Sequence, residues 1–416
     1  MTNSDKLKIY KVGGCIRDRL LGIPVTDNDF VVVGSTPQQM LKMGFKQVGR
    51  DFPVFLHPKT REEYALARSE KKTAGGYHGF TCQTSTNISL IDDLRRRDIT
   101  INAIAEDQDG KLIDPFGGIN DLKLGIIRHV SEAFVEDPLR VLRVARISAK
   151  LNFIVAADTL QLMRHIVDNN ELQLLSNERI WLEVQKALYT HHCSNFFSIL
   201  HQVGAFNKIL PQLAGFSAYS PHFNSFEIIN NTLDSVDKKF ALLCYFINRS
   251  DNNSANKDIN KAHIQHIKNN ITLINNSLDN INDNINEPQI ILSTIKDFIV
   301  NAAVNNKAKD LANKLLVYYA FTSKINNLDS QDILSLITKL DPLRRKDAYH
   351  NFIELVYAIA KLNNDQSTLD NLAILEKITH EFNQIDYGAL HIDNHETFLT
   401  RIHNCKIKII EKYRYL

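Results

Sequence analysis

The segment that most constrains the fold is a strand-forming run that meets a glycine pair and then a helical pattern. The run covers residues 8–12, Gly13 and Gly14 follow it, and Ile16 and Leu20 then recur at helical spacing. This order predicts a strand, a tight turn and the start of a helix. Glycine lets the backbone approach a ligand closely, and the free N–H groups at a helix N-terminus attract anions. The turn is therefore a candidate phosphate site.

Two aspartates, Asp27 and Asp29, stand one residue apart in front of the apolar residues 30–33. We predict that both lie on a strand, and because side chains alternate along a strand, both carboxylates should face the same side. Neighbouring carboxylates repel each other unless a cation lies between them, and oxygen ligands suit Mg²⁺. Either motif alone is more often an ordinary turn or loop, but together they indicate a site for a phosphate and Mg²⁺.

The chain has 416 residues, of which 44% are hydrophobic, so we expect about two to four domains with true cores. No apolar run reaches the roughly 18 residues of a membrane helix, and the polar N-terminus has no signal-peptide core. We therefore expect a cytoplasmic protein without a membrane partner. The 5 cysteines are scattered, which fits neither a disulfide framework nor a zinc site, and we expect them to be reduced.

The net charge is only +2, so the chain as a whole does not indicate a polyanionic partner. Basic residues nevertheless cluster in the first 150 positions, at Lys71 and Lys72, at residues 95–97, and at Arg140, Arg143 and Arg146. These clusters would suit a polyanion, although a run of charges is more often a solvated face.

The first 130 residues alternate between strand and helix signals. They comprise a helix start at Thr36 and Pro37, strands at 53–56 and 63–67, a glycine-rich, mobile loop at 69–79, and a helix within 92–105. From Glu136 onward the pattern is helical, with three arginines near one face and a helix cap at Ser176. The domains expected from this pattern are 1–135, 136–220 and 221–416.

Five short motifs in this order carry a family resemblance. They read "VGGCIRD" at 12–18, "DNDF" at 27–30, "LRRRDITINA" at 94–103, "EDPLR" at 136–140 and "ERIWLE" at 178–183. With them the chain resembles the class II tRNA nucleotidyltransferases of bacteria, which are the CCA-adding enzymes and their poly(A) polymerase relatives. The resemblance is dense over residues 8–190 and faint after that.

The resemblance implies an α+β fold: a nucleotidyltransferase head with a small mixed β-sheet and helices, followed by an all-α neck, body and tail. It implies template-independent addition of CCA to the 3′ end of tRNA from CTP and ATP, with release of pyrophosphate. A poly(A) polymerase, or an enzyme that adds only CC or only A, is the alternative within the same chemistry. A non-enzymatic RNA-binding protein is a third possibility, which the paired aspartates disfavour. A monomer is favoured, and the sequence leaves the oligomeric state open.

The family's catalytic roles carry over to the matching positions of the head. Asp27 and Asp29 correspond to the metal pair that binds Mg²⁺, and Glu63 is the candidate for a third catalytic carboxylate. The nucleotide's phosphates and ribose are then expected at Gly13, Gly14, Arg17 and Arg97. Arg95 and Arg96 are expected only to be solvated.

The family's base-selecting roles fall on the residues after the head. Asp137 and Arg140 correspond to the carboxylate and arginine that act as a protein template for the incoming base, and Arg143 and Arg146 correspond to further nucleotide contacts. The alternative is that this motif merely starts a helix. The "ERIWLE" segment would brace the template helix, so Glu178, Arg179 and Glu183 are expected to be structural.

The C-terminal region departs from relatives that carry a metal-dependent HD phosphohydrolase domain. Tyr245 and Phe246 stand where those relatives have His and Asp, an upstream His falls on Asn230 or Asn231, and the chain contains no His-Asp dipeptide. An aromatic pair cannot replace such ligands. The segment 391–396, "HIDNHE", lacks the pattern of a metal-binding helix. We therefore predict that HD phosphohydrolase activity is absent.

Overall fold

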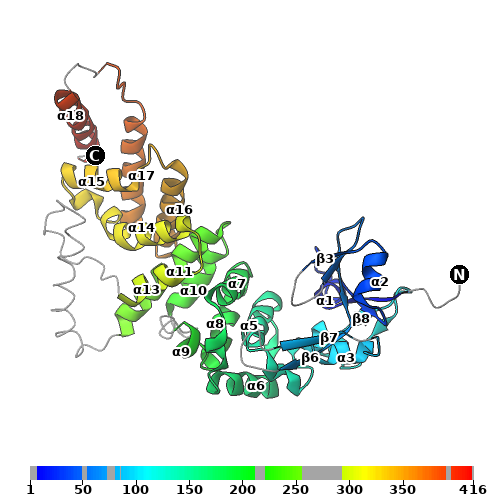
Figure 1. Cartoon of the computed structure of the whole chain (residues 1–416). Coiled ribbons are helices and arrows are strands. Elements are labelled where there is room, and N and C mark those ends of the chain that lie inside the picture. Colours follow the sequence, from blue (N-terminus) through cyan, green and yellow to red (C-terminus); the bar gives the residue numbers. More distant parts are fainter. Residues whose placement is uncertain are drawn as a thin grey trace. The chain divides into compact units, whose positions relative to one another are not determined.

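The structure is a computed structural model that describes residues 7–48, 54–72, 80–84, 86–210, 221–254, 293–389 and 395–414. The chain divides into two compact units, Met1–Pro211 and Gln212–Leu416, and the described strands all belong to the first (Figure 1). The three domains expected from the sequence, with boundaries after residues 135 and 220, remain a prediction.

The first unit is built on a mixed sheet of seven strands in the order β3-β4-β5-β2-β1-β8-β9. The strands are β1 (Lys8–Val12), β2 (Asp29–Val33), β3 (Lys46–Val48), β4 (Val54–Leu56), β5 (Glu63–Leu66), β8 (Ala105–Glu106) and β9 (Leu112–Ile113). Only β2 and β5 pair in parallel, while the other neighbours are antiparallel. The predicted small mixed sheet is confirmed.

Among the described residues, four short helices accompany this sheet, and two of them pack on its opposite faces. They are α1 (Gly14–Leu20), α2 (Pro37–Lys42), α3 (Leu90–Arg95) and α4 (Gly118–Leu124). Because side chains alternate along β2, Val31 packs in one cluster with Leu94 of α3, and Val32 packs in another with Met40 of α2. The sheet centre, which carries the glycine turn and the aspartates, is therefore held by apolar packing on each side.

Two sequence predictions in this unit are wrong. Residues 92–105 do not form one helix, because α3 ends at Arg95 and the backbone of Ile99 and Thr100 pairs instead with His129 and Arg128. A 3₁₀ turn over Thr100–Asn102 and strand β8 follow. Stretches rich in β-branched residues favour such extended pairing.

The predicted loop at 69–79 is also partly wrong. β6 (Arg68–Lys72) pairs antiparallel with β7 (Phe80–Thr84), so residues 69–72 belong to a ribbon. Residues 73–79 lie outside the described residues. A smaller difference concerns Asp27, which precedes β2 and does not lie on it.

The remainder of the first unit is mainly helical. It contains α5 (Leu139–Leu151), α6 (Ala157–Asp168), α7 (Asn177–Leu188), α8 (Cys193–Gln202) and α9 (Phe206–Ile209). Ser176 caps α7 as predicted, since its side chain accepts a hydrogen bond from the N–H of Arg179. A two-residue strand, β11 (Ile154–Val155), interrupts the helices and pairs in parallel with β10 (Ile126–Ile127).

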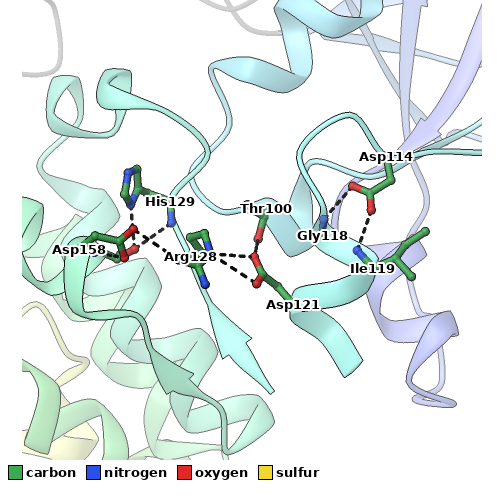
Figure 2. Close-up of polar contacts among 9 residues, drawn as sticks. Thr100, Asp114, Gly118, Ile119, Asp121, Arg128, His129 and Asp158 are labelled. Carbon is green, nitrogen blue, oxygen red and sulfur yellow. Dashed lines mark hydrogen bonds and ion pairs between the residues drawn. The ribbon is translucent and has the colours of Figure 1, made fainter. Parts of the chain in front are cut away.

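A chain of polar contacts joins α4 to α6 beside β10 (Figure 2). Arg128 lies 3.3 Å from a carboxylate oxygen of Asp121 and 3.4 Å from one of Asp158. The hydroxyl of Thr100 donates to Asp121 over 2.7 Å, and the backbone N–H of Thr100 donates to the carbonyl of Arg128. The buried Asp121 therefore holds together three segments that are far apart in the sequence.

Gly118 at the start of α4 leaves no room for a side chain. An added Cβ would lie 2.2 Å from the carbonyl oxygen of Thr100, which is backbone and cannot move aside cheaply. We expect Gly118→Ala to destabilise the first unit by about 2 kcal/mol or more, as overpacking of a tight contact does. The control is Gly117→Ala, where φ is +74° but the space is open, so the expected strain is only about 1 kcal/mol. Urea unfolding monitored by circular dichroism measures the two stabilities, and equal midpoints for the two variants would contradict this account.

The second unit is all-α over its described residues. Its helices are α10 (Pro221–Asn230), α11 (Val236–Ser254), α13 (Ser293–Asn301), α14 (Asn306–Thr322), α15 (Ser330–Leu340), α16 (Lys346–Leu362), α17 (Gln366–Phe382) and α18 (His395–Arg414). Within the part of the chain that the structure describes, no helix combines the length and apolar character needed to cross a membrane.

Candidate active site

A cavity of about 510 Å³ lies in the first unit, where the glycine turn, the β2 and β5 strands and the start of α5 meet. Asp29 and Glu63 are both in its wall. These residues are also direct partners in the parallel β2–β5 pairing, so two carboxylates begin neighbouring strands. The structure thus places the predicted third carboxylate beside the predicted metal ligand. Its catalytic role remains a proposal.

The electrostatics of Asp29 fit a cation. Burial raises the pKa of the Asp29 carboxyl, Arg97 and Arg143 oppose this, and the negative charge of Asp27 raises the pKa further. The net result is a raised pKa of Asp29, so the nearby arginines do not fully offset the burial of its carboxylate and its repulsion by Asp27. Mg²⁺ is commonly held by one or two carboxylates together with substrate phosphates and water. Among the described residues no group of three or more His, Cys, Asp or Glu side chains forms a metal cage. Asp29 therefore suits Mg²⁺ as part of a site that a nucleotide would complete, whereas Asp27 precedes β2 and is not among the residues that line the cavity, so its metal-binding role remains a proposal.

The glycine turn comes close to both the acidic and the basic part of the cavity. Gly13 has a φ of +82°, and a Cβ at this position would lie 3.0 Å from a guanidinium nitrogen of Arg97 and 3.9 Å from a carboxylate oxygen of Asp29. Gly14 begins α1 and also lines the cavity. The requirement for glycine at the turn is therefore both conformational and steric.

Arg97 is held by the protein but keeps hydrogen-bond donor capacity that the described part of the protein does not use. Its guanidinium lies 3.4 Å from Asp93 and donates over 3.4 Å to the carbonyl of Asn102, while its buried Nε has no hydrogen-bond partner among the described residues. Burial and the neighbouring Arg96 lower the pKa of Arg97, although Asp93 partly offsets them. An unsatisfied buried donor is unfavourable, so an anion in the cavity would complete its contacts.

Two of the predicted nucleotide contacts are engaged elsewhere in this structure. Arg17 is buried, pairs with Asp18 at 2.7 Å and donates to Asn102 over 2.6 Å, and it does not line the cavity. Arg146 is paired with Glu183 and is likewise absent from the cavity wall. The predicted nucleotide contacts of Arg17 and Arg146 remain proposals, and the partner of Arg146 agrees with the bracing role expected for Glu183.

The other predicted base-selecting residues surround the start of α5. Asp137 accepts a hydrogen bond over 3.0 Å from the N–H of Leu139, the first residue of α5, so its side chain does cap an N–H at the helix start, although the residue directly before α5 is Pro138. Arg140 is buried and donates to two backbone carbonyls, those of Ala133 and Arg96, each over 2.6 Å. Asp137 and Arg140 both line the cavity. A cap and a base-reading role are therefore compatible in this geometry.

Arg143 joins the cavity through a strong ion pair. It lies 2.7 Å from Asp98, and both residues line the wall. Burial alone would raise the pKa of Asp98, but the charge of Arg143 and its hydrogen bond hold that pKa well below its usual range. Asp98 in turn accepts from Asn102, the partner of Arg17. This network fixes α5 relative to the glycine turn.

Several wall residues were missed or misread from the sequence. Arg96 was expected to be solvated, yet its side chain is 18% exposed, it pairs with Asp93 at 2.8 Å and it lines the cavity, so that expectation is wrong. Arg179 was expected only to brace α5, but it also lines the cavity and lies 3.8 Å from Asp137. Arg68 received no role and is in the wall as well. Arg96 stands in the arginine run at 95–97 and Arg179 in the "ERIWLE" motif, whereas no pattern in the sequence indicates a role for Arg68.

The second unit contains the positions that would be metal ligands in an HD domain. Tyr245 and Phe246 on α11 are 1% and 4% exposed. The Tyr245 ring lies 5.0 Å from that of Tyr319, its hydroxyl accepts from Arg249 over 2.7 Å, and the ring of Phe246 lies 6.0 Å from that of Phe226. Side chains thus pack this region as an aromatic core. Residues 391–394 of the "HIDNHE" segment lie outside the described residues.

Comparisons with known proteins give the family. The chain matches the family described as the poly A polymerase head domain over residues 9–128, and the one described as a probable RNA and SrmB-binding site of polymerase A over residues 152–216. A multifunctional CCA protein of Chromobacterium violaceum is 38% identical over 92% of this chain and 92% of its own length. One from Mannheimia succiniciproducens is 40% identical over 83% of this chain and 82% of its own length.

Solved structures share the fold. A CCA-adding enzyme in its apo form I aligns with a TM-score of 0.63 at 19% identity, over 98% of this chain and 87% of that chain. The Bacillus stearothermophilus CCA-adding enzyme in complex with CTP aligns with a TM-score of 0.59 at 21% identity, over 98% of this chain and 94% of that chain. Given 38% identity over nearly the whole length of a relative, the chain belongs to the family of the multifunctional CCA proteins, which are class II CCA-adding enzymes.

Proposed function

We propose that this chain adds CCA to the 3′ end of tRNA without a nucleic-acid template, using CTP and ATP and releasing pyrophosphate. The observation that carries the proposal is the cavity, whose wall contains the carboxylates Asp29 and Glu63 together with several arginines, among them Arg97, Arg140 and Arg143. Carboxylates that fit Mg²⁺ beside several guanidiniums suit a reaction between a hydroxyl and a polyphosphate. The relatives over most of the chain are named multifunctional CCA proteins, which favours CCA addition over a poly(A) polymerase.

Asp27 and Asp29 would hold Mg²⁺, with Glu63 as the adjacent carboxylate. Mg²⁺ bound there supplies Lewis-acid chemistry, because it favours the ionised 3′-hydroxyl of tRNA and offsets charge at the α-phosphate. The close turn at Gly13 lets the polyphosphate approach the backbone, and Arg97 binds it with the Nε and guanidinium donors that are weakly satisfied in the protein. The 3′-hydroxyl loses its proton to water, its oxygen forms the new bond to the α-phosphorus, and the bond from the α-phosphorus to the bridging oxygen breaks, so that pyrophosphate leaves with that oxygen.

Asp137 and Arg140 would select the base. CTP and ATP each present an amino donor next to a ring-nitrogen acceptor, whereas UTP and GTP present a carbonyl next to an N–H. A carboxylate that accepts and a guanidinium that donates match the first pattern and oppose the second. The contacts of Arg140 with two backbone carbonyls fix the guanidinium, while further N–H groups stay available to a base.

The decisive assay uses purified protein with tRNA that lacks its 3′ end. Each labelled nucleotide is supplied singly, and CTP and ATP are then supplied together. We expect addition of two C residues with CTP alone and of CCA with both. A long A tract would instead indicate a poly(A) polymerase. Arrest after CC with both nucleotides present, or extension only of tRNA that already ends in CC, would indicate an enzyme of partial activity. Binding of tRNA without extension would indicate a non-enzymatic protein. Localisation in the cytoplasm and a monomeric state remain part of the proposal.

We further propose that the second unit has no HD phosphohydrolase activity. Tyr245 and Phe246 offer no metal ligand of the required kind, and their rings are packed against Tyr319 and Phe226. We expect no hydrolysis of a 2′,3′-cyclic nucleotide with Ni²⁺ or Mg²⁺ present. The proposal is wrong if the protein hydrolyses the cyclic nucleotide, a chelator abolishes this hydrolysis, and the Asp29→Ala variant retains it. The second unit would then bind a catalytic metal.

A further inference from the structure

A single buried carboxylate lies behind the arginine side of the cavity. Asp93 on α3 is 0% exposed and is absent from the cavity wall. It accepts hydrogen bonds from Arg96 over 2.8 and 3.2 Å, from Arg97 over 3.4 Å, and from the backbone N–H of Arg68 over 3.4 Å. These three donors are residues of the cavity wall, so Asp93 connects the start of β6 with both arginines that follow α3.

The charges explain why such a carboxylate is needed. Arg96 and Arg97 are close enough for each to disfavour the other's charge, and the cavity wall also contains Arg140 and Arg143. Burial by itself would raise the pKa of Asp93, but the two neighbouring guanidiniums lower it below its ordinary value. Asp93 is therefore ionised at neutral pH. It offsets the repulsion between adjacent arginines and limits their side-chain freedom.

We propose that Asp93 is a positioning residue for the nucleotide's polyphosphate: it holds Arg96, Arg97 and the backbone at Arg68 in the cavity wall before the ligand arrives. The inference rests on the proposed function of this cavity. A guanidinium that is already held loses little conformational freedom when the ligand binds, whereas a mobile arginine loses much more when it is fixed. Asp93 touches none of the reacting atoms, so its effect must pass through the arginines.

The test compares Asp93→Asn with Asp92→Asn in the full chain. Asp92 is the neighbouring residue on the same helix, but it is exposed, and within the described residues its carboxylate hydrogen-bonds to the helix cap at Ser89 and not to a residue of the cavity wall. The probes are CTP and inorganic tripolyphosphate, each titrated calorimetrically with Mg²⁺ present. We expect Asp93→Asn to lower the affinity for both probes at least tenfold and by similar factors. Asp92→Asn should change each affinity less than twofold. In the extension assay the KM for CTP should rise much more than kcat falls, since the chemistry at the metal is unchanged.

A double-mutant cycle separates positioning from general damage. In an Arg97→Met background one of the groups through which Asp93 acts is gone, so Asp93→Asn should weaken tripolyphosphate by a clearly smaller factor than it does in the native chain. The same factor in both backgrounds would overturn the proposal. Should Asp93→Asn fail to fold by circular dichroism, Asp93→Glu keeps the charge but displaces it by one methylene, and it should weaken tripolyphosphate about threefold or more. A folded Asp93→Glu variant with native affinity would equally overturn it.

The Arg97→Met variant distinguishes this inference from the proposed function. If Arg97→Met weakens tripolyphosphate and Asp93→Asn does not, the positioning role is wrong and the phosphate role of Arg97 stands. If Arg97→Met binds tripolyphosphate as the native chain does, the phosphate role is wrong, and the positioning role that rests on it is wrong as well.

Discussion

Asp29→Ala is expected to reduce addition of both CMP and AMP to tRNA by more than about 100-fold, which corresponds to roughly 3 kcal/mol in the transition state. The reason is that Asp29 lines the cavity and is proposed, together with Asp27, to hold Mg²⁺. Affinity for tRNA should change less than about twofold, because the effect arises at the reacting phosphate. Asp27→Ala should behave in the same way. Single-turnover extension and filter binding measure the two quantities.

The matched control is Glu62→Ala. Glu62 is an acidic residue next to Glu63 but outside the cavity wall, where it accepts hydrogen bonds from Asn28 and Thr60. Its loss should leave the extension rate within a few-fold of the native value. More than about a tenth of the native rate in Asp29→Ala, or an equal loss in Glu62→Ala, would remove the metal assignment.

A stability measurement gives an independent readout of the same site. The pKa of Asp29 is raised in the folded protein, so the folded state binds its proton more tightly than the unfolded state does. The stabilising contribution of that proton is present at low pH and is lost as the pH rises through the folded pKa. Without metal, Asp29→Asn should therefore unfold at a higher temperature than the native chain at pH 7, and this advantage should shrink in acid. Excess Mg²⁺ should reduce it too, because only the native chain binds the ion well.

Local patterns in the sequence were sufficient to predict the elements that carry the glycine turn and Asp29. The run before Gly13 became β1, the helix after it became α1, and the apolar residues after Asp29 became β2. The helix starts at Thr36 and Ser176 followed from side-chain capping, which depends on neighbouring residues only. Each of these elements is indicated by a hydrophobic period or a capping residue that can be recognised within a few residues of sequence.

The remaining features depend on contacts between distant segments. Ile99 and Thr100 are not helical because their backbone pairs with that of Arg128 and His129, and no local pattern in the sequence reveals those distant partners. Arg96 looked like a solvated charge because its partner, Asp93, is buried only after α3 packs on the sheet. Asp137 received a base-reading role from the family resemblance, while its contact with Leu139 required the actual path of the chain.

Asp137→Asn is expected to change which bases the protein accepts. The Asp137 Oδ1 atom accepts from the N–H of Leu139, so an asparagine can keep this cap with its own oxygen. Its amide nitrogen then replaces Oδ2 and offers a donor where the native side chain offers an acceptor. A donor suits the carbonyl of UTP or GTP and opposes the amino group of CTP or ATP. We expect the ratio of UTP to CTP incorporation, and of GTP to ATP, to rise at least tenfold, since each buried unsatisfied group is worth about 1–3 kcal/mol.

Asparagine is a sharper test here than removal of Arg140. Arg140 donates to the carbonyls of Ala133 and Arg96 from a buried position, so Arg140→Ala would strand two acceptors and lower activity through stability as well as through recognition. Glu136→Gln provides the control, because it neutralises the adjacent acid of the same motif, and Glu136 does not line the cavity. That variant should keep the native preference for CTP and ATP. If Asp137→Asn instead changes the incorporation rates of all four nucleotides by one factor, Asp137 serves only to start α5, and other residues select the base.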